Sequence, residues 1–192
     1  MIKNVLVVLG PPGSGKGTQG KMLAPILKYN YLSMGQYLRQ FSEGESELSQ
    51  QVKQTIDSGR IIRDEWMTQI FPTAIAGLPD ADGIILDGFP RDLGQTPILE
   101  TFLREHQTEN FKVLFLEVEK EDLIKRITQR ESQGGEMRAD DNPEIISTRF
   151  EEYKNKTYPL KKYFEDRGVL ITVNGNQPIE GTHQEILRKL GL

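Results

Sequence analysis

The sequence predicts an α/β fold, in which a parallel sheet of about five strands is flanked by helices. The first indication is a set of short, continuous apolar runs, a pattern typical of strands that are covered on both faces. These runs lie at residues 5–9, 84–86, 113–116 and 169–171, and a shorter strand is expected at 30–33. The second indication is the helical spacing between the runs, which gives a repeated strand–helix rhythm. A length of 192 residues fits a single domain, residues 1–192.

The helices carry their own start and stop signals. Asn142 offers an N-cap, and Pro143 follows at the first helical position. Gly168 offers a C-terminal stop, and Pro159 should kink or divide the helical stretch between these marks. Residues 182–185 have the capping-box spacing S/T-x-x-E before an apolar pattern, so we expect the chain to end in a helix that starts there.

Two polar stretches fit neither the sheet nor its covering helices. Residues 33–63 lie between the first two strand–helix units, and residues 131–141 form a short, charged, glycine-bearing segment. Ligands bind such sheets beyond the carboxyl ends of the strands. Both stretches are therefore predicted to be insertions at that end of the sheet.

The composition excludes several classes of function. A net charge of −4 argues against a general grip on nucleic acid, and the absence of cysteine removes thiolate zinc sites and thiol nucleophiles. His106 and His183 are interpreted as surface residues without chemistry. No apolar run approaches the ~18 residues that span a bilayer, and residues 5–9 are too few for a secretory signal. We expect a cytoplasmic protein without membrane or nucleic-acid partners.

A glycine-rich loop follows the first apolar run directly and precedes a helical pattern. It spans residues 10–18, with the sequence GPPGSGKGT. Its glycines let backbone N–H groups fold around a phosphate, while the helix start and Lys16 add positive charge. Gly17 stands where the general motif has a hydroxyl residue, and Thr18 comes one position later. The loop predicts a nucleotide-phosphate site; the alternative is a glycine-rich turn that happens to contain a lysine.

This loop variant resembles that of the nucleoside monophosphate kinases, and the adenylate kinase family most closely. Further matching motifs follow in order along nearly the whole chain. They are Arg39, DSGRII at 57–62, DGFPR at 87–91 with Gln95, Arg126, Arg130, RADD at 138–141, Arg149 and VNG at 173–175. The resemblance implies a P-loop kinase that transfers a phosphoryl group from Mg-ATP to a nucleoside monophosphate, with AMP favoured. It also implies a monomer, an acceptor-binding insertion at 33–63, and a short lid at 131–141 without zinc.

The resemblance implies a set of site residues as well. The expected catalytic residues are Lys16, Arg91, Arg126, Arg130, Arg138 and Arg149. The expected ATP-binding residues are Gly13, Ser14, Gly15, Lys16, Gly17, Thr18, Arg126 and Gln177. The expected AMP-binding residues are Ser33, Met34, Arg39, Ile62, Gly88, Arg91, Gln95, Arg138 and Arg149. Guanidinium groups suit these roles because their planar forks match phosphate oxygens.

Three of these assignments have ordinary structural alternatives. Asp87 ends the run 84–86 and could hold Mg²⁺ through water near the phosphate loop, or it could simply form an Asp-Gly turn. The Gln95 amide can both donate and accept, as an adenine edge requires, but it could also be a solvated glutamine. Arg126 and Arg130 are four residues apart, and ordinary acidic surface partners could balance them as well as a phosphate could.

The chain departs from the family in the acceptor segment. The usual pattern is S-T-G-D-x-L-R, and here residues 33–39 read SMGQYLR. Met34 and Gln36 are therefore expected to alter the surroundings of the acceptor base. Three functions stay open: an AMP kinase, a kinase for CMP, UMP or dAMP, and a non-catalytic nucleotide-binding regulator. Gln95 argues against the second, and the retained Lys16 and Asp87 argue against the third.

Overall fold

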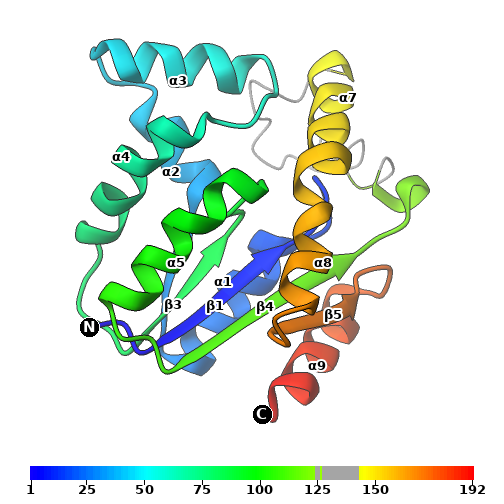
Figure 1. Ribbon diagram of the computed structural model, residues 1–192. Coiled ribbons are helices and arrows are strands. Elements are labelled where there is room, and N and C mark those ends of the chain that lie inside the picture. Colours follow the sequence, from blue (N-terminus) through cyan, green and yellow to red (C-terminus); the bar gives the residue numbers. More distant parts are fainter. Residues whose placement is uncertain (124–125, 127–142) are drawn as a thin grey trace.

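The fold is a parallel sheet with helices on both faces (Figure 1). The computed structural model describes residues 1–123, 126 and 143–192. Its strands are β1 (Asn4–Leu9), β2 (Asn30–Ser33), β3 (Gly83–Asp87), β4 (Asn110–Glu117) and β5 (Leu170–Asn174). They lie in the order β2-β3-β1-β4-β5, and every adjacent pair is parallel. The predicted α/β class and all five predicted strands are confirmed.

Helices connect the strands, and some of them lie beyond the carboxyl ends of the strands. Those before β4 are α1 (Lys16–Leu27), α2 (Met34–Phe41), α3 (Glu47–Asp57), α4 (Asp64–Ala76), the 3-10 helix η1 (Leu93–Gln95) and α5 (Thr96–Glu105). After β4 come α7 (Pro143–Glu152), the π-helix η2 (Tyr153–Thr157), α8 (Pro159–Glu165) and α9 (Ile179–Leu190). Among the described residues, no helix is both long enough and apolar enough to cross a membrane.

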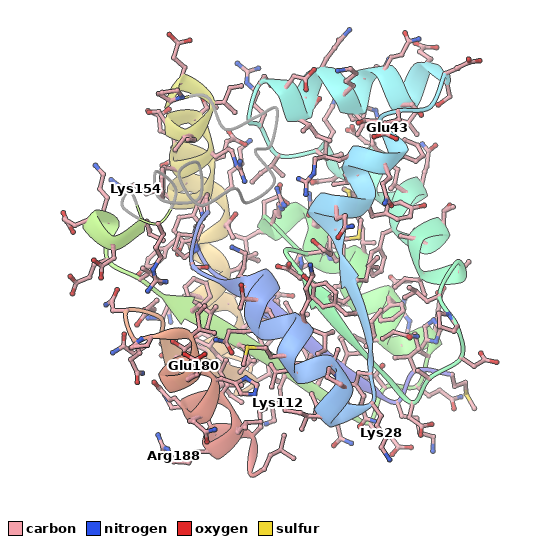
Figure 2. All side chains as sticks on the ribbon, turned by 180° about the vertical axis from the view of Figure 1, so that it is seen from behind. Lys28, Glu43, Lys112, Lys154, Glu180 and Arg188 are labelled. Atoms are coloured by element: carbon pink, nitrogen blue, oxygen red, sulfur yellow. The ribbon has the colours of Figure 1, made fainter. Side chains whose placement is uncertain are left out.

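The core consists of two apolar layers, one on each face of the sheet. Val5, Val7 and Leu9 of β1 face the layer that α4, α5 and α8 cover. The intervening Leu6 and Val8 face the opposite layer, where α1 and α9 pack. Figure 2, drawn from behind, shows these two helices over the sheet. The apolar run of β1 is continuous because both faces of the strand are buried.

The helix boundaries confirm one sequence signal and correct another. Pro159 divides the stretch as predicted, since α7 and α8 are separate helices joined by η2. Pro143 is the first residue of α7, whereas its predicted cap, Asn142, lies outside the described residues. The predicted capping box at 182–185 is wrong. The helix α9 starts earlier, and the Thr182 N–H already donates to the Pro178 carbonyl at 3.0 Å, so Thr182 lies inside the first turn.

The segment 33–63 holds α2 and α3, which stand beyond the carboxyl ends of β2 and β3 (Figure 1). Leu38 of α2 and Val52 of α3 join the same apolar layer as α4. This segment is therefore packed onto the sheet-covering helices and contributes one wall of the space above the strands. The other predicted insertion, 131–141, lies outside the described residues.

Candidate active site

The phosphate loop connects the end of β1 to the start of α1. Gly10, Gly13 and Gly15 have φ angles of 146°, 81° and 90°, which residues with a side chain rarely adopt. Lys16 opens α1, and its Nζ donates hydrogen bonds to the carbonyl oxygens of Gly10 at 2.9 Å and Pro11 at 2.7 Å. The first turn of α1 carries no acidic residue. The loop thus presents a helix N-terminus and an ammonium group together, as an anion site requires.

A cleft at the carboxyl ends of the strands brings most of the predicted site residues together. The predicted residues that line it are Gly13, Ser14, Gly15, Lys16, Gly17, Thr18, Ser33, Arg39, Ile62, Asp87, Gly88, Arg91 and Arg149. They come from α1, β2, α2, β3 and α7 and from the loops that connect the elements. Segments far apart in the sequence therefore share one cavity.

The cleft is cationic although the whole chain has a net charge of −4. Its charged lining residues are the cationic Lys16, Arg39, Arg60, Arg91 and Arg149 and the anionic Asp87 and Glu152. A concave surface that gathers one sign of charge attracts ligands of the opposite sign. The cleft therefore favours a ligand with several phosphate groups.

Arg39 and Arg91 converge beside Gly35. A Cβ atom added at Gly35 would lie 3.1 Å from Nη2 of Arg91 and 3.7 Å from Nη1 of Arg39. The Arg91 Nε also donates to the Gly88 carbonyl at 3.0 Å, which fixes one edge of this guanidinium. Two guanidiniums close together repel each other, and a phosphate between them would remove that cost. This geometry suits a phosphate group, and the predicted acceptor-phosphate role of the two arginines stays a prediction.

Asp87 lies at the carboxyl end of β3 and is 8% exposed. Its Oδ2 accepts a hydrogen bond from the Tyr31 hydroxyl at 2.7 Å, and a Cβ atom added at Gly17 would lie 3.4 Å from the same oxygen. Proteins usually bind Mg²⁺ through one or two carboxylates, with waters and substrate phosphates completing the shell. A single carboxylate beside the phosphate loop fits that chemistry. Within the described ranges, no three His, Cys, Asp or Glu side chains gather as a metal-binding group.

Gln95 does not line the cleft. It is 2% exposed, so the alternative of a solvated glutamine is wrong. Its Oε1 accepts from the Arg91 N–H at 2.9 Å, and its Nε2 donates to the Ile62 carbonyl at 3.0 Å. The amide thus connects two backbone segments that the cleft brings together. Its predicted role at an adenine edge stays a prediction.

Met34 also lies away from the cleft wall. Its side chain is 1% exposed and packs in the apolar layer on the α4 side of the sheet, whereas Gln36 is exposed. Burial accounts for an apolar residue at position 34 without reference to an acceptor base. The predicted contact of Met34 with that base stays a prediction.

Arg126 contacts the loop that joins β5 to α9, and Gln177 belongs to that loop. The Arg126 Nη2 donates to the Gly175 carbonyl at 2.7 Å, and the Gln177 Nε2 donates to the Asn174 carbonyl at 3.2 Å. Neither residue lines the cleft described above. The remaining two predicted arginines, Arg130 and Arg138, lie outside the described residues.

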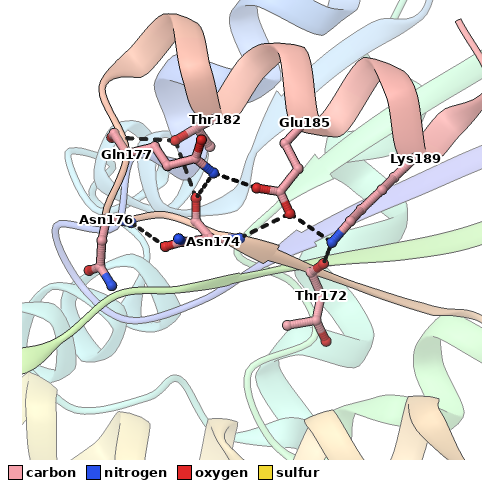
Figure 3. Close-up of polar contacts among 7 residues, drawn as sticks. All are labelled: Thr172, Asn174, Asn176, Gln177, Thr182, Glu185 and Lys189. Atoms are coloured by element: carbon pink, nitrogen blue, oxygen red, sulfur yellow. Dashed lines mark hydrogen bonds and ion pairs between the residues drawn. The ribbon is translucent and has the colours of Figure 1, made fainter.

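The same loop is held on α9 by a polar network (Figure 3). Glu185 accepts from the Gln177 amide, from the Asn174 N–H at 3.4 Å and from Lys189 at 2.7 Å. Burial opposes the charge of Glu185, but the hydrogen bonds from Lys189, Asn174 and Gln177 outweigh it and lower the pKa of this carboxyl. The carboxylate is thus stabilised where it fixes the loop.

Two side chains lie in places that the sequence did not indicate, and one of them lines the cleft. Tyr153 of η2 lines the cleft, and burial, with Tyr158 and Glu117 nearby, raises its pKa well above the ordinary value. Its hydroxyl therefore stays protonated and able to donate. His183 is 7% exposed, and its Nδ1 lies 3.1 Å from Oε1 of Gln19, so the prediction of a surface histidine is wrong. Nothing in the residues around Tyr153 or His183 distinguishes these side chains from ordinary packing or surface residues of a helix. The sequence therefore offered no signal for the place of Tyr153 in the cleft or for the burial of His183.

The fold and the cleft define a nucleotide-phosphate-binding protein of the P-loop class. The family model described as adenylate kinase matches residues 8–169. An adenylate kinase of Bartonella bacilliformis is 38% identical over 185 residues, covering 94% of this chain and 96% of the relative. The adenylate kinases of Brucella anthropi and Brucella ovis are each 38% identical over 189 residues. Each match covers 96% of this chain and 97% of the relative. The chain belongs to the adenylate kinase family and is thus a nucleoside monophosphate kinase.

Proposed function

We propose that this chain transfers the γ-phosphoryl group of Mg-ATP to AMP and releases two ADP, through the residues of the cationic cleft. Family membership supports the reaction. The observation that carries the residue assignment is the convergence of Arg39 and Arg91 in the same cleft as the phosphate loop with Lys16. One site suits an acceptor phosphate and the other a donor triphosphate.

The reaction needs no general base from the protein. The second pKa of a phosphate monoester is about 6, so the acceptor oxygen is already anionic at neutral pH. The work left to the protein is to align the two phosphates, neutralise their charge and exclude water. Among the residues that the structure describes, the cleft lining holds five cationic side chains and no histidine, which suits that work.

The donor phosphates would lie along the loop Gly13–Thr18, where backbone N–H groups and Lys16 neutralise them. Lys16 would exchange its hydrogen bonds with the Gly10 and Pro11 carbonyls for bonds to phosphate oxygens. The donor adenine would meet Arg126 and the backbone around Gln177. The network around Glu185 supports this placement because it fixes the loop that carries Gln177.

The acceptor phosphate would bind Arg39 and Arg91, with Ser33 and Gly88 beside them, and the acceptor base would extend toward Ile62 and Gln95. Arg149 of α7 reaches the same cleft and would contact the transferring group. Arg130 and Arg138 are proposed to join it there. Bidentate guanidinium contacts would hold the group in line and offset the charge that spreads over its oxygens.

Asp87 would hold a water of the metal ion, because its carboxylate lines the cleft and lies beside the first turn of α1 at Gly17. When bound there, Mg²⁺ would supply positive charge that offsets the charge of the phosphate oxygens. No zinc is proposed. The Tyr31 hydroxyl and the first turn of α1 border the Asp87 carboxylate, which supports a metal-bearing donor beside the phosphate loop.

The segment 33–63 is proposed to bind the acceptor, and 131–141 to close over the donor. The first proposal is supported by the position of Arg39 and Ile62 in the cleft wall. Closure would exclude water and prevent futile hydrolysis of the donor. A monomeric state, a cytoplasmic location and the absence of nucleic-acid or membrane partners stay predictions.

An acceptor panel tests the function. Purified protein with Mg-ATP would be given AMP, dAMP, CMP, UMP or no acceptor, and the nucleotide products would be separated and quantified. We expect AMP to give the highest kcat/KM, with ADP formed in a ratio of two per AMP consumed. A preference for CMP or UMP would assign the chain to another acceptor, and product formation with none of them would favour the regulatory alternative.

A further inference from the structure

Tyr31 makes a direct contact with the carboxylate that we assign to the metal. It belongs to β2, where it pairs with Ile85 of β3, and Asp87 lies two residues further along β3. The Tyr31 side chain leans along the strand, so that its hydroxyl donates to Asp87 Oδ2 at 2.7 Å. A hydrogen bond of this length to a carboxylate is both short and directional. Tyr31 therefore constrains how the Asp87 carboxylate is turned.

The Tyr31 ring packs directly against the backbone of α1 at Gly20, where there is no side chain. A Cβ atom added at Gly20 would lie 2.5 Å from Cε2 and 3.1 Å from Cδ2 of this ring. Such distances are too short for a real contact, so any side chain at position 20 would push the ring away. The ring can reach Asp87 because position 20 is glycine.

The first turn of α1 also lies beside the contact between the Tyr31 hydroxyl and the Asp87 carboxylate. A Cβ atom added at Gly17 would lie 3.4 Å from the Tyr31 hydroxyl and 3.4 Å from Asp87 Oδ2. Position 17 is where the general phosphate-loop motif has a hydroxyl side chain. In this chain, a hydroxyl from β2 lies beside that position and is already engaged with the carboxylate.

We propose that Tyr31 is a positioning residue for Asp87: it fixes the orientation in which this carboxylate receives a water of the nucleotide-bound Mg²⁺, and Gly20 makes room for it. The inference rests on the proposed function of the cleft. The competing explanation is purely structural, because Tyr31 also packs against the apolar layer between the sheet and α1. Partners that orient a metal-binding group typically change metal affinity or activity by about 10- to 100-fold when they are removed.

The test is Tyr31→Phe, which keeps the ring and removes the hydroxyl. We expect the Mg²⁺ concentration that gives half-maximal turnover to rise about tenfold, while turnover at saturating Mg²⁺ changes much less. A binding readout accompanies it: calorimetry with two adenosines joined by five phosphates, with and without Mg²⁺. The gain in affinity that Mg²⁺ provides should shrink about tenfold, and affinity in its absence should stay the same.

Gly20→Ala provides an independent second variant. It keeps the Tyr31 hydroxyl but displaces its ring, so it should shift the Mg²⁺ dependence in the same direction. The double variant should show little further shift, because both changes break the same contact. This variant keeps the proposal testable if Tyr31→Phe does not fold.

Tyr29→Phe is the matched control. The Tyr29 ring lies against Gly83 at the opposite end of β3, in the same kind of tyrosine–glycine contact but far along the strand from Asp87. It should leave the Mg²⁺ dependence unchanged even if it alters stability. Both variants keep the ring and remove one hydroxyl. A general effect of removing a tyrosine hydroxyl would appear in both variants, whereas a positioning role affects only Tyr31.

The outcomes separate this proposal from the proposed function. If the wild-type protein makes ADP from ATP and AMP, and Tyr31→Phe and Gly20→Ala both keep its Mg²⁺ dependence within about twofold in both readouts, the positioning role is wrong. If the wild-type protein makes no ADP, the proposed function fails. The Mg²⁺-dependent binding of the bisubstrate ligand then still decides whether Tyr31 acts on the metal-bearing nucleotide.

Discussion

Replacing Lys16 with methionine should separate the catalytic contribution of the phosphate loop from its stability. Methionine keeps most of the length of the side chain and removes its charge. In the structure, the Lys16 ammonium donates to the carbonyls of Gly10 and Pro11 and to the Ser14 hydroxyl, so the change removes hydrogen bonds that hold the loop. The net contribution of such bonds to stability is modest, and we expect the free energy of unfolding to fall by about 1–3 kcal/mol. A domain of ordinary stability, about 5–15 kcal/mol, stays folded after that loss.

The effect on turnover should be much larger. Removing one group that stabilises developing charge typically lowers kcat by about 10²–10³-fold, equivalent to about 3–4 kcal/mol of barrier. The Lys16 ammonium is the cation at the start of α1 and lies within the phosphate loop, so the upper part of this range is expected. Loss of stability cannot mimic the effect, because unfolding measured on the same samples gives the folded fraction directly.

The assay is initial rate with saturating ATP, AMP and Mg²⁺, together with urea unfolding of each variant. Lys21→Met is the control, since Lys21 lies on the same helix with its side chain exposed to solvent. Its rate should match that of the wild type. If Lys16→Met kept more than about half of the wild-type turnover, the assignment of this loop to catalysis would be wrong.

Two further predictions concern the acceptor segment and α9. Met34→Thr empties part of the buried core and should lower the free energy of unfolding by about 2 kcal/mol or more, whereas Gln36→Asp on the surface should stay within about 0.5 kcal/mol in urea unfolding. The double variant should lower KM for AMP with kcat changed less, and an unchanged KM would separate both positions from the acceptor base. Glu185→Gln should lower stability at neutral pH. The difference from the wild type should shrink as pH falls through and below 4.5, because the lowered pKa of Glu185 stabilises the fold only while the carboxyl is ionised. A difference that persists in acid would contradict that account.

Local patterns predicted the elements whose signals are local. The run at residues 5–9 showed a strand buried on both faces, and Pro159 showed where a helical stretch divides. The phosphate loop was predicted for the same reason: its glycines and Lys16 are adjacent in the sequence, and the loop between a strand and a helix has few alternative shapes.

The position of a side chain could not be predicted in this way where it depends on residues that are distant in the sequence. Met34 is covered by helices that follow it in the sequence, so its burial depends on packing that no local pattern encodes. Gln95 reaches the Ile62 carbonyl, 33 residues away, and Tyr31 reaches Asp87, 56 residues away. The start of α9 was misplaced because the 182–185 spacing is a valid cap only when the preceding backbone is not already helical.

The connection through Gln95 has a consequence for exchanging parts between relatives. The Arg91 backbone is held on both sides: its N–H by Gln95, and its carbonyl by the Thr157 hydroxyl at 2.6 Å. The other end of the Gln95 amide is bonded to the Ile62 carbonyl, at the C-terminal edge of the acceptor segment. A chimera that takes residues 33–63 from another kinase is connected to the rest of the chain by two peptide bonds. Its backbone carbonyl at position 62 must also accept the hydrogen bond from the Gln95 amide. A chimera whose backbone at position 62 follows the same path should fold with Arg91 in its present position. A chimera whose backbone departs from this path should leave the buried Gln95 amide donor without its acceptor, which costs about 1–3 kcal/mol.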